Sequence, residues 1–115
     1  MSDVVASTLD RLSHVPGVRS ALIVDAEAGV PVASELGTGA SGTAMAALTA
    51  SLFRRTDQAV REAALGGLGS FQLETEEGHV LVAGRPELIV VVVADRDAQL
   101  GLIRLEMDRA VEALQ

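Results

Sequence analysis

Short turns separate most of the strand-like segments of this chain, and this limits the sheets that it can form. The β-branched and alternating segments are Val18 to Asp25, Val30 to Glu35, Gly69 to Glu76, His79 to Gly84 and Leu88 to Ala94. The first two, and likewise the last three, are joined by a few residues rich in glycine, proline and acidic side chains. Tight turns join antiparallel neighbours, whereas parallel strands need a crossover of about a dozen residues. The sequence therefore predicts an α+β fold in which helices pack on an antiparallel sheet.

The longest predicted helix, Thr43 to Leu65, has a wide apolar arc. At about 100° per residue, its apolar and small side chains fill roughly 160°. The larger apolar members are Met45, Leu48, Leu52, Phe53 and Val60. The opposite side carries Arg54, Arg55, Gln58, Arg61 and Glu62. One interpretation is an ordinary core helix with a solvated polar face. The other is a helix that contacts both its own sheet and a second copy of the chain.

The remaining apolar segments complete the predicted layers. The valine-rich segment Leu88 to Ala94 is apolar on both faces, which is typical of a central strand covered from both sides. Asp95 and Asp97 follow it, and we expect them to cap the last helix, because carboxylates bind the exposed amides at a helix start. Leu102 and Leu105 lie on the far side of that helix. We therefore expect a first helix, near the N-terminus, to cover them.

Composition excludes several classes of function. We expect one domain over residues 1–115, because a chain of this length can bury a single core. The net charge is −7 at pH 7 and only two residues are aromatic, so neither a basic face nor a base-stacking platform is available for nucleic acid. The absence of cysteine excludes disulfides and thiol chemistry. We find no secretory signal at Met1-Ser2-Asp3 and no span for a membrane, and we expect a cytoplasmic protein with no membrane insertion.

Two motifs resemble ligand-binding sites, one for a dinucleotide and one for a metal ion, but the sequence around each does not fit such a site. Gly37 to Gly42 matches the G-x-G-x-x-G dinucleotide pattern, yet the preceding strand belongs to a hairpin and not to a parallel βαβ unit. The Asp95/Asp97 pair could hold a divalent cation, but the sequence nominates no further oxygen ligands. Neither His14 nor His79 has a neighbouring nucleophile with which to form a triad. We therefore predict no cofactor, no metal and no catalytic residues, and a protein that is not an enzyme.

The order and spacing of these segments resemble the Roadblock (dynein light chain/Roadblock) domain family, in its bacterial branch typified by the mutual gliding-motility B protein. The matching stretches are Gly17 to Asp25 followed by Gly29, the long small-residue helix, and Asp95 followed by Gln99 to Arg104. The resemblance implies a five-stranded antiparallel sheet with the middle helix on one face and both terminal helices on the other. It also implies a homodimer formed by pairing the third strands (Gly69 to Glu76) and the middle helices.

The resemblance extends to partners. It implies a homodimeric regulator or scaffold of a small Ras-like GTPase, which could promote hydrolysis without donating an arginine finger. The implied dimer interface contains Met45, Leu48, Leu52, Phe53, Val60, Phe71 and Leu73. The implied GTPase-facing surface contains Arg54, Arg55, Gln58, Arg61 and Glu62. Two alternatives stay open: a dimerisation platform in a signalling or motility complex with no effect on nucleotide turnover, and a small-ligand sensor.

Overall fold

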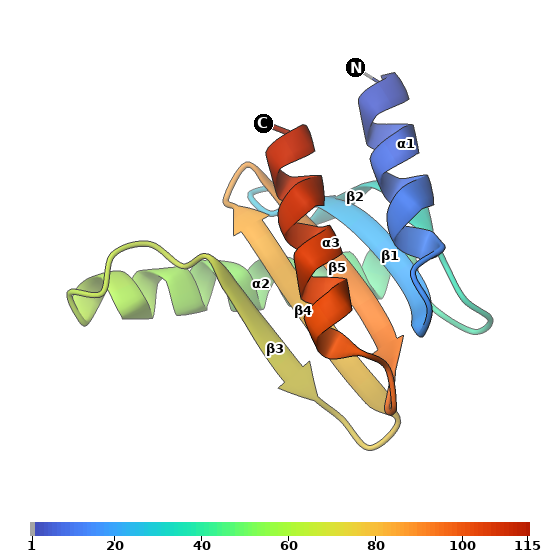
Figure 1. Ribbon diagram of the computed structural model, residues 1–115. Coiled ribbons are helices and arrows are strands. Elements are labelled where there is room, and N and C mark those ends of the chain that lie inside the picture. Colours follow the sequence, from blue (N-terminus) through green and yellow to red (C-terminus); the bar gives the residue numbers. More distant parts are fainter. Residues whose placement is uncertain (1) are drawn as a thin grey trace.

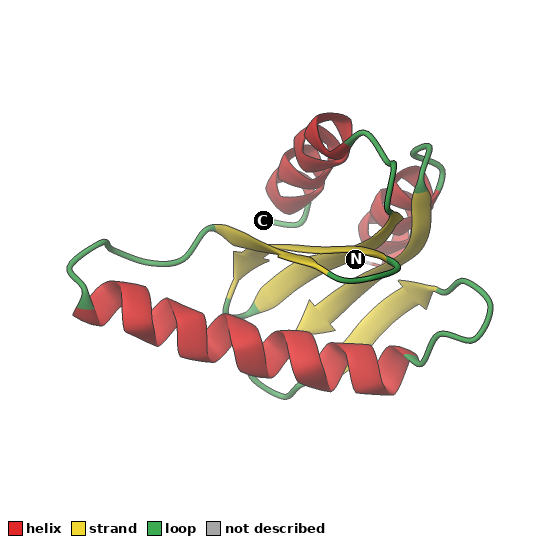
Figure 2. Cartoon of the chain, turned by 90° about the horizontal axis from the view of Figure 1, so that it is seen from below, coloured by secondary structure: helices red, strands yellow, loops and turns green. Residues whose placement is uncertain are grey.

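One sheet lies between two helical layers in the computed structural model, which describes residues 2–115 (Figure 1). The elements follow in the order α1 (Ser2–Ser13), β1 (Val18–Asp25), β2 (Val30–Glu35), α2 (Gly42–Glu62), β3 (Ser70–Glu74), β4 (Gly78–Arg85), β5 (Leu88–Asp95) and α3 (Leu100–Ala113). Figure 2 shows α2 alone on one face of the sheet, with the other two helices on the opposite face. The predicted α+β fold and its distribution of helices are confirmed.

The sheet has five strands in the order β2-β1-β5-β4-β3, and every neighbouring pair is antiparallel. The β1–β5 pair joins the N-terminal hairpin to the C-terminal three-strand meander. β5 is the central strand, as its valine-rich sequence predicts, and Ile89 to Val92 are fully buried. The two edges are β2 and β3, so the predicted place of the third strand at an edge agrees with the structure.

The alternation of side chains along the central strands builds a core on each face. Ile23, Val90 and Val92 pack with Leu9, Leu12, Ile103 and Met107 of α1 and α3. The residues between them in the strands, such as Leu22 and Val91, pack against α2 around Phe53. Successive side chains of a strand point to opposite faces, so a strand apolar throughout can serve both cores.

The helix α2 is buried only along its first half. Its buried side chains are Ala46, Thr49, Ala50 and Phe53, and the half that follows projects past β3 (Figure 1). The helix ends at Glu62, short of the predicted Leu65. Ala64 adopts a left-handed conformation with φ of 63°, which no helix can continue through. Half of the longest helix therefore lacks sheet beneath it.

Two predictions about the last helix are wrong. Asp95 is the last residue of β5, and the N-cap of α3 is Gln99, whose side chain makes no capping hydrogen bond. The connection after β5 continues through residues 96–99 before α3 begins, so neither Asp95 nor Asp97 reaches the helix start. Leu102 and Leu105 are 37% and 48% exposed. Both terminal helices lay their apolar faces on the sheet, and α1 consequently leaves the far side of α3 uncovered.

Candidate protein-interaction surface

The polar side of α2 is exposed, but its three arginines differ in how they are held. Arg54 donates a hydrogen bond to the backbone carbonyl of Ala26, in the turn between β1 and β2. Arg61 pairs with Asp57, with 3.1 Å between Nε and Oδ2. Arg55 makes no hydrogen bond or ion pair within residues 3–115. Of the three, Arg55 is the one whose guanidinium is available to another molecule.

Asp57 connects the projecting half of α2 to the chain that leads into β3. Its Oδ1 accepts a hydrogen bond of 2.8 Å from the backbone amide of Leu68, while its other oxygen faces Arg61. The Leu68 amide, and then Arg61, hold the pKa of Asp57 below its ordinary value of 3.8, because both stabilise the carboxylate. The polar side of α2 therefore contains a pre-formed ion pair next to the free Arg55.

The apolar flank of α2 and the inner face of β3 contain most of the predicted dimer-interface residues. Leu48 is 52% exposed. The half-buried members are Met45, Leu52, Val60, Phe71 and Leu73. Phe53 differs from all of these, because it is fully buried between α2 and its own sheet. As a core residue of the single chain, Phe53 has no surface with which to contact a second copy directly.

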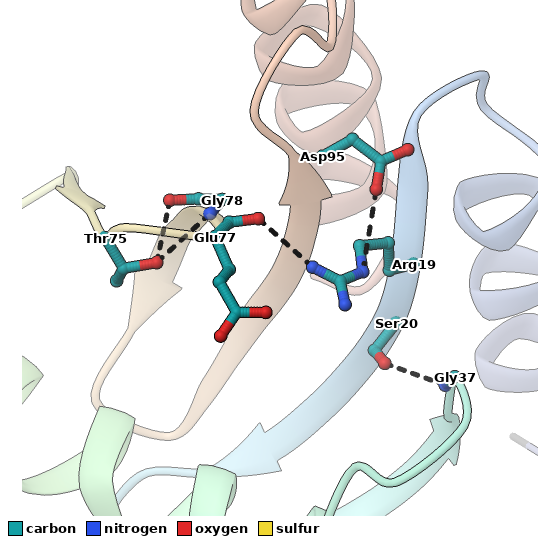
Figure 3. Close-up of polar contacts among 7 residues, drawn as sticks. All are labelled: Arg19, Ser20, Gly37, Thr75, Glu77, Gly78 and Asp95. Atoms are coloured by element: carbon teal, nitrogen blue, oxygen red, sulfur yellow. Dashed lines mark hydrogen bonds and ion pairs between the residues drawn. The ribbon is translucent and has the colours of Figure 1, made fainter.

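A polar network ties the other end of the sheet together (Figure 3). Nε of Arg19 lies 3.5 Å from Oδ1 of Asp95, and the same guanidinium donates to the backbone carbonyl of Glu77 in the β3–β4 turn. Ser20 accepts a hydrogen bond of 2.8 Å from the backbone amide of Gly37. These contacts attach the β3–β4 turn and the loop after β2 to the first residues of β1.

The glycine-rich loop after β2 covers a cavity of about 500 Å³. Loop residues 36–41 line it together with Arg19, Leu22, Met45 and Val93. Ser41 caps α2 by accepting a hydrogen bond of 3.2 Å from the amide of Ala44. β2 pairs antiparallel with β1, so this loop does not have the parallel-strand setting of a dinucleotide fingerprint.

Comparison with known proteins agrees with this architecture. The Roadblock/LC7 domain family matches residues 4–94. The chain belongs to the Roadblock/LC7 family. The uncharacterized protein MJ0714 of Methanocaldococcus jannaschii is 30% identical over 115 residues, covering 96% of this chain and 97% of that protein.

Solved structures of this fold include MglB proteins. Myxococcus xanthus MglB superposes with a TM-score of 0.87 at 21% identity, covering 97% of this chain and 85% of that one. A structure of MglB in a tetrameric arrangement gives a TM-score of 0.83 at 25% identity, covering 98% and 85%. The predicted Roadblock fold and its MglB-like branch are confirmed.

Within residues 2–115 of this Roadblock/LC7 chain, no group of three or more histidine or acidic side chains is placed to hold a metal ion. None of the helices in the same range is both long and apolar enough to cross a membrane. Asp95, considered above as a metal ligand, pairs with Arg19 instead.

Arg19 is the residue that sequence reasoning missed. In the sequence, Arg19 is a single cation in a strand of β-branched and small residues. Any solvent-facing position of a strand can carry such a residue, so the sequence does not indicate a special role for it. Its role depends on the β3–β4 turn and the end of β5 lying beside the start of β1, which only the assembled sheet provides.

Proposed function

We propose that this Roadblock/LC7 chain is a homodimeric regulator or scaffold of a small Ras-like GTPase. The observation that carries the proposal is the exposed surface of α2, whose second half projects beyond its own sheet with an arginine-bearing side, while Leu48 on the apolar flank of the first half is 52% exposed. A lone chain leaves this half of the helix without a packing partner. A second copy followed by a protein partner would supply contacts for both sides.

The dimer would form at the β3 edge. An edge strand presents a row of unpaired backbone groups, and pairing β3 with its symmetry mate would remove both edges at once. The apolar flank of α2 would then lie near the two-fold axis. We assign the contacts to Met45, Leu48, Leu52, Val60, Phe71 and Leu73. The MglB structure with a tetrameric arrangement supports self-association in this branch of the family.

The GTPase would dock on the polar side of the paired α2 helices. Arginine is enriched in interface hot spots, because its planar fork pairs with carboxylates while its stem packs. Arg55 is the free guanidinium, with Gln58 and Glu62 exposed on the same side of the helix. Arg54 and Arg61 would position this surface through Ala26 and Asp57. The dimer would then act by favouring the hydrolysis-competent state of the GTPase through binding energy.

The test compares charge reversal at two exposed arginines. Arg55→Glu should weaken GTPase binding by at least about tenfold, because the new carboxylate would face the acidic groups of the GTPase that pair with the arginine. Arg85→Glu makes the same change of charge at the exposed last residue of β4 and should leave binding within about twofold. Binding is measured by calorimetry with a Ras-like GTPase from the same genome, loaded with GDP or a non-hydrolysable GTP analogue. Equal affinity of Arg55→Glu and the wild type would remove this surface assignment.

The rate of GTP hydrolysis separates the regulator from the platform. A regulator raises the single-turnover rate of the bound GTPase, whereas a dimerisation platform binds it and leaves that rate unchanged. The measurement uses the full chain in excess over GTPase, so that every GTPase is bound. No change in rate at saturation would assign the platform function.

A further inference from the structure

A groove runs between the two terminal helices, on the face of the sheet opposite α2 (Figure 2). α1 and α3 contact each other and run in opposite directions, so that both ends of the chain lie at the same end of the molecule (Figure 1). This α1–α3 groove has a volume of about 430 Å³. It is lined by Arg11 and residues 14–16 at the end of α1, and by Leu102, Glu106 and Arg109 of α3. The dimer proposed above uses α2 and β3, so the α1–α3 groove stays open to another molecule.

The apolar side chains along the α1–α3 groove are exposed. Leu102 is 37% exposed, and Leu105, its neighbour on the surface of α3, is 48% exposed. Val4 precedes Arg11 by two helical turns, so it lies on the same side of α1, where it is 45% exposed. Two helices packed side by side leave a groove that accepts the side-chain ridge of a third helix. The length and shape of this apolar surface therefore suit a helix better than an extended strand.

The walls of the groove present cations to solvent, although the chain has a net charge of −7. Arg11 makes no hydrogen bond or ion pair through its side chain within residues 3–115. On the opposite wall, Arg109 pairs with Glu106 at 3.1 Å, and the arginine side chain is 59% exposed while the glutamate is only 17% exposed. The backbone carbonyl of Asp10, and then its carboxylate, raise the pKa of His14 above the ordinary 6.5, because both stabilise the protonated ring. Each wall therefore offers one arginine to an approaching molecule.

We propose that the α1–α3 groove binds an amphipathic helix of a protein partner, in which acidic residues flank an apolar stripe on both sides. The apolar stripe would cover Val4, Leu102 and Leu105. A helix seated between two others turns one flank to each of them, so acidic side chains on one flank would face Arg11 and those on the other flank would face Arg109. A second copy of this chain is less complementary, because its own α1–α3 groove carries the same arginines.

The test titrates a synthetic peptide of about 18 residues, or five helical turns, into the full chain labelled with ¹⁵N. Leucine recurs every three or four residues to form one stripe, glutamate flanks the stripe on both sides, and alanine fills the remaining positions. We expect amide shift changes centred on residues 4–15 and 101–109, and an affinity that falls as salt rises.

Two control peptides test the two parts of the proposal. Lysine in place of glutamate, or serine in place of leucine, should weaken binding at these residues by at least about tenfold. The lysine control is stringent, because the overall charge of −7 attracts a basic peptide to the protein as a whole. Equal binding of either control peptide, or shifts centred on another surface, would overturn the proposal.

Two charge reversals on opposite faces of the sheet separate this proposal from the GTPase-binding surface. Arg11→Glu should weaken the leucine–glutamate peptide by about tenfold and leave GTPase binding within about twofold. Arg55→Glu makes the same change of charge on α2 and should leave peptide binding within about twofold. Leu102→Gln, at a partly exposed helix position, should also weaken the peptide by about tenfold with an unchanged circular dichroism spectrum. Wild-type peptide affinity in both groove variants contradicts the site. Shifts at these residues that depend on protein concentration without peptide would overturn the proposal in favour of a second copy.

Discussion

At the scale of single residues, a few polar side chains decide where connections are attached. Asp57 holds the amide of Leu68, Arg54 holds the carbonyl of Ala26, and Arg19 reaches both Asp95 and the carbonyl of Glu77. In each case a charged side chain of a regular element fixes a backbone group of a turn or connection that is distant in sequence. Hydrogen bonds to charged groups are stronger than hydrogen bonds between neutral groups. These contacts therefore fix the positions of the turns and connections more firmly than the residues of the loops themselves do.

Replacing Asp57 with asparagine should reveal a pH-dependent contribution to stability. The pKa of Asp57 is lowered in the folded state, so its carboxylate stabilises the fold above the ordinary value of 3.8, and this contribution is lost as the pH falls through the folded-state value. Asparagine keeps an oxygen for the amide of Leu68 but removes the charge. The denaturation midpoint of Asp57→Asn should lie below that of the wild type at pH 7.

The same pair of proteins provides the control. At a pH below the lowered folded-state pKa the wild-type carboxyl is neutral as well, and the two midpoints should converge. The measurement is urea denaturation followed by circular dichroism at both pH values. A gap of equal size at pH 7 and at low pH would mean that the ion pair with Arg61 does not stabilise the fold.

At the scale of elements, α2 and α3 differ in how they begin. Ser41 caps α2 with its side chain, whereas Gln99, the N-cap of α3, makes no side-chain hydrogen bond, and the first turn of α3 has no acidic residue. The first amides of a helix have no hydrogen-bond partner within the helix, so a helix without a side-chain cap is less stable than the same helix with one. The helix is held mainly by the packing of Ile103, Met107 and Ala110 on the sheet.

Gln99→Ser should therefore stabilise the protein. Gln99 already has the extended backbone of an N-cap, with φ of −79° and ψ of 90°, and a serine hydroxyl there can accept a hydrogen bond from the first turn. We expect a gain of about 1 kcal/mol, which corresponds to a rise in Tm of about 4 °C. Gln99→Ala is the control, because it changes the side chain without adding an acceptor. Equal melting temperatures for the serine and alanine variants would contradict the capping explanation.

The strands were predictable from sequence more accurately than the helix ends and the exposed surfaces. β1 and β2 begin and end where the alternation and the turn residues predict, because both signals are local. The early end of α2 depends on Ala64 and on the bond between Asp57 and Leu68, which is a tertiary contact. Phe53 and Leu48 both fall within the apolar arc, and only the rotation of α2 on the sheet decides that the first is buried and the second exposed.

At the scale of the whole molecule, the two edges of the sheet differ in the proposed dimer. The β3 edge, with the apolar flank of α2, would join two copies, while the β2 edge would remain at each end of the joined sheet. The arginine-bearing side of α2 would lie between these ends. Such an assembly would hold a GTPase at its centre.

Leu48→Asp should convert the proposed homodimer into a folded monomer. Leu48 is 52% exposed in the single chain, so the aspartate stays hydrated in the monomer but would be buried without a partner in the dimer, at a cost of several kcal/mol. Light scattering at micromolar concentration should give twice the 11.9 kDa of one chain for the wild type and a single chain for the variant. Circular dichroism should be unchanged.

A matched substitution tests which side of α2 forms the dimer interface. Ala47→Asp places the same charge on the exposed side of α2 that points away from the sheet, about 100° round the helix from Leu48, and should leave the mass at that of the dimer. A monomeric wild type would contradict the homodimer outright. Dissociation by Ala47→Asp, but not by Leu48→Asp, would place the interface on the outer side of the helix.

The pairing of β1 with β5 has a consequence for how the chain reaches its fold. The β1–β2 hairpin and the β3–β4–β5 meander each form from neighbouring segments, and the two are joined in the sheet by the β1–β5 pairing, which runs from Val18 opposite Ala94 to Val24 opposite Ile89. Contacts between such distant segments require a large loop to close and slow the folding of a sheet. Until the hairpin docks, the valine-rich central strand has an open edge that any other unfolded chain could join. The pairing of β1 with β5 thus removes an edge at which the unfolded chain could aggregate.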